Sequence, residues 1–138
     1  MIDLRTSFSR FNYGGTQPKE EYEVTLATML SQWDKFLNGK EFINGKLSYI
    51  DFMFWELIDM LSLVFPGNSL CLSVKSYGQH LETIFEKSEN LLAYYKRFAQ
   101  LPKINAYLES DKFQVSPISG PMARYGGDDS LKRTKKFY

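Results

Sequence analysis

The sequence predicts an all-α fold, a helical bundle of about five helices around one buried central helix. Two observations carry this prediction. Apolar residues recur at three- and four-residue steps in several segments, which is the period of an amphipathic helix. One further segment, residues 52–65, is apolar on nearly every side, and such a helix must be surrounded by other elements. A length of 138 residues and a hydrophobic content of 43% fit a single globular domain.

The central helix is predicted to begin at Ser48. Asp51 follows three residues later, and this spacing predicts a reciprocal N-capping arrangement. In it the serine oxygen accepts from the amide of Asp51, and the carboxylate accepts from the amide of Ser48. Leu47 before the cap and Phe52 just inside the helix fit a hydrophobic staple.

The same segment is long enough to be considered as a membrane span. However, Asp51, Glu56 and Asp59 lie inside it, and a carboxylate near the centre of a bilayer costs roughly 2.5–3.5 kcal/mol. We therefore predict the core helix of a soluble domain. Asp51 and Asp59 could also be read as a carboxylate pair for acid–base chemistry, but the capping role of Asp51 argues against this.

Two helices are predicted before the central one. The first is marked by apolar residues from Ile2 to Phe11, with Tyr13 at its end and Gly14-Gly15 as its stop. It begins at the first residue without a cap, which suggests the back part of something longer. The second has Pro18 at its first helical position, continues from Tyr22 to Leu37 and closes at Asn38-Gly39.

The pattern after the central helix is less regular. Pro66-Gly67-Asn68 ends that helix, and residues 69–88 carry only faint strand and helix signals. A clear helical period returns over residues 91–101 and is stopped by Pro102, and residues 104–108 make a short last helix. We predict one domain over residues 1–125 and a disordered basic tail over residues 126–138, short and flanked by glycines, rather than a binding patch.

Composition excludes several classes of function. The net charge of +1 argues against a nucleic-acid binder. Cys71 is the single cysteine, which excludes an internal disulfide and fits a reducing compartment. His80 is the only histidine, so neither a histidine-rich metal site nor a serine–histidine relay is expected. We find no signal peptide and no transmembrane segment, and predict a cytoplasmic protein with no catalytic residue, metal or cofactor of its own.

Several motifs resemble one family. The segment from Phe42 to Phe52, FINGKLSYIDF, resembles the capped loop-to-helix signature in the all-α C-terminal domain of glutathione S-transferases. The segments LPKINAYL at 101–108 and SDKF at 110–113 are similar to the penultimate helix of the mu class. The tripeptides SPI at 116–118 and DLR at 3–5 resemble the start of its C-terminal segment and of its first C-domain helix. The resemblance spans residues 2–125.

The resemblance implies roles for particular residues. Asp3 matches the aspartate that reaches, in the mu-class dimer, across to glutathione held by the other subunit. Tyr13 matches the tyrosine that lines the hydrophobic-substrate pocket and whose hydroxyl donates to a product or leaving group; the alternative is an aromatic contact at the helix end. Gly120 and Pro121 fall near the pocket wall contributed by the C-terminal segment. Ser48 and Asp51 remain structural.

Two departures from the family limit what the chain is expected to do. The glutathione site and the catalytic tyrosine of the family lie in an N-terminal thioredoxin-like domain, and nothing here resembles one. The stretch over residues 69–90 is also longer than the usual connection between these helices.

Two hypotheses follow. In the first, the chain is the C-terminal domain of a mu-like transferase that conjugates its co-substrate glutathione to hydrophobic electrophiles as a homodimer, and is inactive alone. In the second, it is a non-catalytic α-helical interaction module. Neither involves nucleic acid or a membrane.

Overall fold

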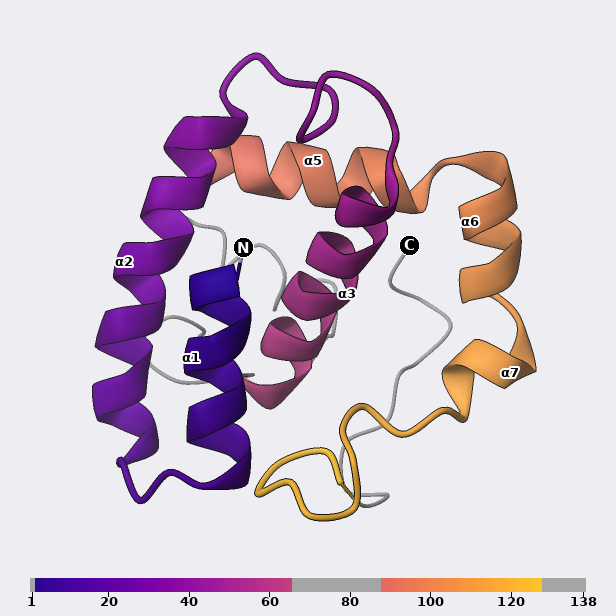
Figure 1. Ribbon diagram of the computed structural model, residues 1–138. Helices are drawn as coiled ribbons and strands as arrows, with labels where there is room; N and C mark the ends of the chain where they lie inside the picture. Colours follow the sequence, from indigo (N-terminus) through magenta and orange to yellow (C-terminus); the bar gives the residue numbers. More distant parts are fainter. Residues whose placement is uncertain (1, 66–87, 128–138) are drawn as a thin grey trace.

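The computed structural model of the chain describes residues 2–65 and 88–127, and this part is all-helical, as predicted (Figure 1). Its helices are α1 (Ile2–Tyr13), α2 (Lys19–Leu37), α3 (Tyr49–Val64), α5 (Glu89–Ala99), α6 (Pro102–Leu108) and α7 (Asp111–Gln114). None of the described helices is long and apolar enough to cross a membrane.

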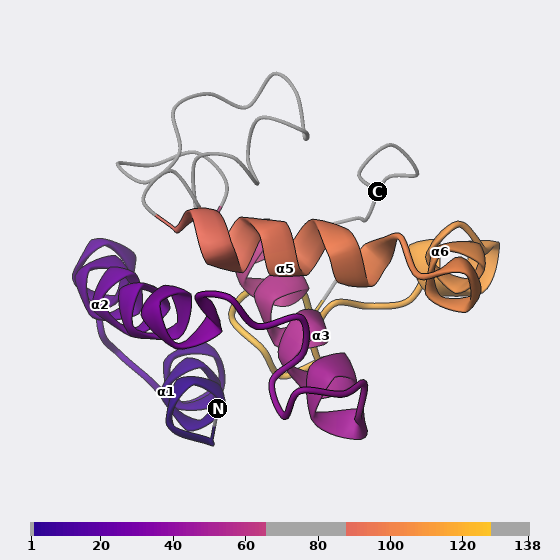
Figure 2. The same ribbon diagram turned by 90° about the horizontal axis from the view of Figure 1, so that it is seen from above.

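The described helices are arranged around α3, as the sequence predicts. In Figure 1, α1 and α2 lie side by side as an antiparallel pair on one flank of α3, and α6 and α7 lie on the other flank. Figure 2 shows α5 crossing over α3 and linking the two flanks. After α7 the chain runs back beneath α3 to the end of α1 (Figure 1).

The central helix owes its position to apolar side chains on most of its surface. Its buried side chains include Phe54, Trp55, Ile58 and Leu61, each no more than 3% exposed. Aromatic rings pack around it: Trp55 stacks on Tyr95 of α5 with ring centroids 5.0 Å apart. The burial is not complete, because Phe52 in the first turn keeps 44% of its surface exposed.

The capping box at the start of α3 forms as predicted, and its carboxylate does more than a cap requires. The carboxylate of Asp51 accepts from the amide of Ser48 at 2.9 Å and from the Ser48 hydroxyl at 3.0 Å. It also accepts from the amide of Ile43 at 2.9 Å and from the phenol of Tyr94 in α5 at 3.0 Å. The amide of Asp51 makes its hydrogen bond to the carbonyl oxygen of Ser48, at 3.0 Å. The carboxylate therefore also joins the loop before α3 and helix α5 to the start of α3.

The phenol of Tyr94 is a dependable donor to this carboxylate. Burial raises its pKa, and the charge of Asp51 and the hydrogen bond between the two groups raise it further. The phenol consequently keeps its proton at any ordinary pH. The bond joins residues 43 positions apart in the chain and ties α5 to the start of α3.

A second carboxylate, Asp34 of α2, caps α5 from outside. It accepts from the amide of Leu91 at 2.9 Å and from the side-chain amide of Asn90 at 3.1 Å. The first amides of a helix have no partner within the helix, and a negative charge near them is favourable. The cap thus fixes where α5 crosses α2.

Helix boundaries differ from the predictions near the prolines. Pro18 precedes α2 as its N-cap, with φ −57° and ψ 147°, where the sequence placed it at the first helical position. The sequence predicted that Pro102 ends the helix before it, but α5 ends at Ala99 and Pro102 is the first residue of α6. The short helix α7 was not predicted, and it begins where the hydroxyl of Ser110 accepts from the amide of Phe113 at 3.3 Å.

Several predictions fall on residues outside the described part. These are the weak signals from 69 to 87, Cys71, His80 and the basic tail from residue 128 onward. Gly126 and Gly127, assigned to the tail from the sequence, are described, and the carbonyl of Gly126 accepts from the amide of Ser119 at 2.8 Å.

We expect Asp51→Ala to cost clearly more stability than Ser48→Ala. Loss of the serine side chain removes one capping group, at about 1 kcal/mol. Loss of the carboxylate leaves the amides of Ile43 and Ser48 without their acceptor, and it leaves the phenol of Tyr94 only its longer bond to the carbonyl oxygen of residue 51, at about 3 kcal/mol or more in total. Thermal and denaturant unfolding of both variants checks this. Equal losses would mean that Asp51 acts only as a local cap.

Candidate functional site

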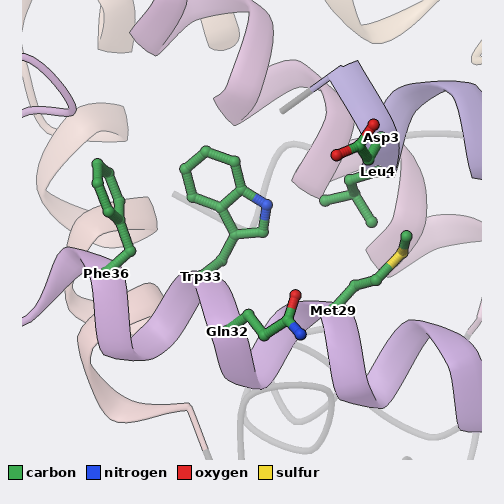
Figure 3. A pocket seen from close by; sticks show the side chains of 6 residues that line it. All are labelled: Asp3, Leu4, Met29, Gln32, Trp33 and Phe36. Carbon is green, nitrogen blue, oxygen red and sulfur yellow. The ribbon is translucent and has the colours of Figure 1, made fainter.

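Asp3 lies at the rim of a pocket between the start of α1 and the second half of α2 (Figure 3). The pocket has a volume of about 270 Å³, and Leu4, Met29, Gln32, Trp33 and Phe36 line the rest of it. The side chain of Asp3 is exposed in the first turn of α1, where a negative charge is favourable. A carboxylate at this rim can pair with the ammonium group of a ligand.

The apolar wall of this pocket is held in place by aromatic packing. The ring of Trp33 packs edge to face on Phe36, with centroids 5.4 Å apart. The same ring packs on Phe54 of α3, with centroids 4.3 Å apart. The ammonium of Lys40 lies 3.5 Å from the centroid of the Phe36 ring. Edge-to-face pairs and a cation over a ring face are favourable arrangements, so the wall is preorganised.

A second, more polar pocket of about 490 Å³ lies along the same two helices and shares Asp3 and Met29 with the first. Its lining includes Ser7, Arg10 and the fully buried Tyr22. Burial raises the pKa of the Tyr22 phenol, and the nearby Ser7 hydroxyl opposes that rise. This pocket could not be predicted from the sequence, because most of its lining residues belong to the polar faces of two amphipathic helices.

Tyr13 occupies the last position of α1, and 49% of its surface is exposed. Its hydroxyl accepts a hydrogen bond from the amide of Gly120 at 2.7 Å. A hydroxyl that accepts one hydrogen bond still has its own proton to donate. The structure therefore brings together Tyr13, which the resemblance assigns to the lining of the hydrophobic-substrate pocket, and Gly120, which the resemblance puts near the wall contributed by the C-terminal segment.

Gly120 fits this corner because it has no side chain. A Cβ atom at this position would lie 3.2 Å from the Tyr13 hydroxyl oxygen, which is tighter than most contacts of that kind. Any larger residue would have to displace the phenol or the loop. The neighbouring Pro121 is exposed.

Asp3 and Tyr13 do not form one site within a single chain. They lie ten residues apart on α1, and a helix rises by 1.5 Å per residue, so about 15 Å separates them along the axis. A single small ligand would therefore not contact both side chains of one chain. Ser48 and Asp51 belong to the helix cap described above. The described residues contain no group of His, Cys, Asp and Glu side chains that could hold a metal ion.

An apolar groove that the sequence did not reveal lies on the opposite flank of α3. Its volume is about 490 Å³, and α3, α5, α6, α7 and the segment after α7 contribute to it. The exposed Phe52 packs edge to face on Phe98 in this groove. The ring centroids of Tyr107 and Phe113 lie 5.4 Å apart. The sequence pattern assigned Phe52 to the buried surface of the central helix, which is why the groove was missed.

Comparison with known proteins places these features in a family context. The family profile described as "Glutathione S-transferase, C-terminal domain" matches residues 2–111. The class-mu 26 kDa isozyme 1 of Fasciola hepatica is 32% identical over 132 residues, which are 94% of this chain and 52% of the relative. Human glutathione S-transferase Mu 3 is 31% identical over 129 residues, 91% of this chain and 50% of the relative.

A solved structure agrees with these sequence matches. The crystal structure of the glutathione S-transferase Blo t 8 superposes with a TM-score of 0.67 at 28% identity. The superposition covers 91% of this chain and 55% of the other. The chain thus spans about half the length of the curated relatives it matches.

We expect Tyr13→Phe to loosen the loop at Gly120 without affecting the helical core. The substitution removes the acceptor of the Gly120 amide, and a net hydrogen bond contributes about 0.5–1.5 kcal/mol, so protection of that amide against exchange falls by about two- to tenfold. Hydrogen exchange followed by NMR measures this. Tyr107→Phe, a tyrosine of equal exposure in α6, is the matched control. An unchanged Gly120 amide in Tyr13→Phe would contradict the assigned contact.

Proposed function

Because the chain belongs to the glutathione S-transferase family, as a C-terminal domain, we propose that it is the helical half of a mu-type transferase. The complete enzyme joins the thiolate of glutathione to hydrophobic electrophiles. The observation that carries this proposal is the match to the C-terminal domain over residues 2–111. A cytoplasmic location, which the single cysteine favours, is part of the same proposal.

In this proposal Tyr13 lines the electrophile pocket. As the thiolate adds to an electrophile and its leaving group departs, negative charge develops on the electrophile or on the leaving group. The proton of the Tyr13 hydroxyl is available to that charge, since the hydroxyl is an acceptor towards Gly120. The exposure of the phenol and its contact with the C-terminal segment support this role.

Asp3 serves the other substrate, glutathione, held by the partner subunit of a homodimer. Its carboxylate suits the ammonium group of the tripeptide, and its pocket has the rings of Trp33 and Phe36 in its wall. The distance of about 15 Å between Asp3 and Tyr13 along α1 supports two separate duties. In this arrangement Asp3 contacts the glutathione that the partner subunit holds. Tyr13 of the same chain faces the electrophile that is bound in its own subunit.

The apolar groove on the other flank of α3 suits the packing of a second domain. Phe52 and Tyr107 in its lining leave 44% and 49% of their surfaces exposed, so their rings are available for packing against another element. The resemblance assigns the glutathione site and the catalytic tyrosine to a thioredoxin-like domain. We infer that this domain covers the groove in the complete enzyme.

A second candidate function is a non-catalytic interaction module, and the same exposed groove favours it. An α-helical domain with an uncovered apolar surface associates with itself or with other proteins. Sedimentation of the purified chain discriminates, because this function requires association at micromolar concentrations. A well-behaved monomer would contradict it.

We expect the purified 138-residue chain to show no conjugation of glutathione to a chromogenic aryl halide above the uncatalysed rate. The reason is that the resemblance assigns the glutathione site and the catalytic tyrosine to a thioredoxin-like domain, and nothing in these 138 residues resembles one. A complete mu-class transferase, such as the 26 kDa isozyme of Fasciola hepatica, is the positive control. Turnover well above the uncatalysed rate would show that the helical half carries a thiol-activating group.

A further inference from the structure

The residue before Tyr13 has a role that the family comparison does not assign. Asn12 is completely buried at the end of α1, although it is polar. Its side-chain amide donates to the hydroxyl of Ser119 and to the carbonyl oxygen of Tyr125, both at 3.2 Å. Its side-chain oxygen accepts from the amide of Tyr125 at 2.9 Å, and its backbone carbonyl accepts from the amide of Arg124 at 2.8 Å. All its partners lie more than 100 residues away in the chain.

The partners of Asn12 belong to one closed loop. The amide of Ser119 donates to the carbonyl of Gly126 at 2.8 Å and joins the two ends of the loop. Within it, the amide of Ala123 donates to the carbonyl of Gly120 at 2.9 Å. Gly126 has a φ of +73°, a conformation that glycine adopts without cost. The loop 119–126 is therefore closed by its own backbone hydrogen bonds.

Two further contacts orient this loop against α1. The guanidinium of Arg124 donates to the carbonyls of Gly15 and Gln17 at 3.0 and 3.1 Å. The ring of Tyr125 stacks on Phe11 with centroids 5.7 Å apart. The hydrogen bonds of Arg124 are exposed, and the contact of Tyr125 is a stack of two rings. Asn12, in contrast, binds the loop through buried hydrogen-bonding groups.

We propose that Asn12 is the positioning residue that latches the loop 119–126 onto α1 and so sets the amide of Gly120 against the hydroxyl of Tyr13. Its side chain pairs with both the N–H and the C=O of Tyr125, as one peptide group pairs with another. An amide is needed for this, because a carboxylate cannot donate and an apolar side chain would leave buried groups unpaired. The significance of the latch for the electrophile pocket rests on the proposed function.

The test is the protection of the Gly120 amide against hydrogen exchange, followed by NMR in the full chain. Asn12→Ala should lower this protection by about tenfold or more, the loss expected for one or two net hydrogen bonds. Amides in the middle of α3 should keep theirs. Asn90→Ala is the matched control, since that asparagine also donates a side-chain hydrogen bond, but to Asp34.

Asn12→Asp adds a readout that a purely space-filling role would not give. Near neutral pH the carboxylate has no proton to donate to Ser119 or to the Tyr125 carbonyl, so Gly120 should lose protection as in Asn12→Ala. Below the pKa of the new carboxyl group, one donor returns and part of the protection should return with it. The natural chain should show no such dependence of its protection factor on pH.

Three results would overturn the proposal: unchanged Gly120 protection in Asn12→Ala, equal losses at Gly120 and in α3, or no recovery of Asn12→Asp at low pH. Should Asn12→Ala fail to fold, Ser119→Ala removes only one acceptor of the Asn12 side-chain amide and should weaken Gly120 protection in the same direction. None of these measurements uses glutathione or an electrophile. Failure of the transferase proposal would therefore leave the latch intact, and failure of the latch would leave the transferase proposal intact.

Discussion

The rest of this domain depends on the hydrogen bonds that the carboxylate of Asp51 accepts. Four donors converge on its two oxygens: the amides of Ile43 and Ser48, the Ser48 hydroxyl and the Tyr94 phenol. A buried carboxylate is costly unless it is fully hydrogen-bonded, so this group stabilises only one arrangement of its neighbours. That arrangement fixes the loop before α3, the first turn of α3 and the crossing of α5 together.

From this fixed point the structure extends to the two flanks that carry function. On one flank, α2 is joined to α5 through Asp34, and the aromatic wall of the Asp3 pocket packs on Phe54 of α3. On the other flank, α6 and α7 leave an apolar groove beside α3. The C-terminal loop connects the two by returning to α1, where Asn12 holds it against Tyr13.

The sequence predicted what is local. The fold class, the start of α3 and the end of α1 followed from helical periods, from a three-residue spacing and from paired glycines. Partners distant in the chain could not be found in this way. The phenol of Tyr94, the carboxylate of Asp34 and the side chain of Asn12 carry no local pattern that names their acceptors or donors. The same holds for the groove at Phe52, because periodicity indicates an apolar face without indicating what covers it.

The most direct test of the account is a double-mutant cycle on Asp51→Ala and Tyr94→Phe, measured as free energies of unfolding. The cycle isolates the contact between the two side chains from the other roles of each. A hydrogen bond to a charged group contributes about 1.5–3 kcal/mol, so we expect a coupling energy in this range between Asp51 and Tyr94. Independent effects, with a coupling near zero, would contradict the claim that Asp51 ties α5 to the central helix.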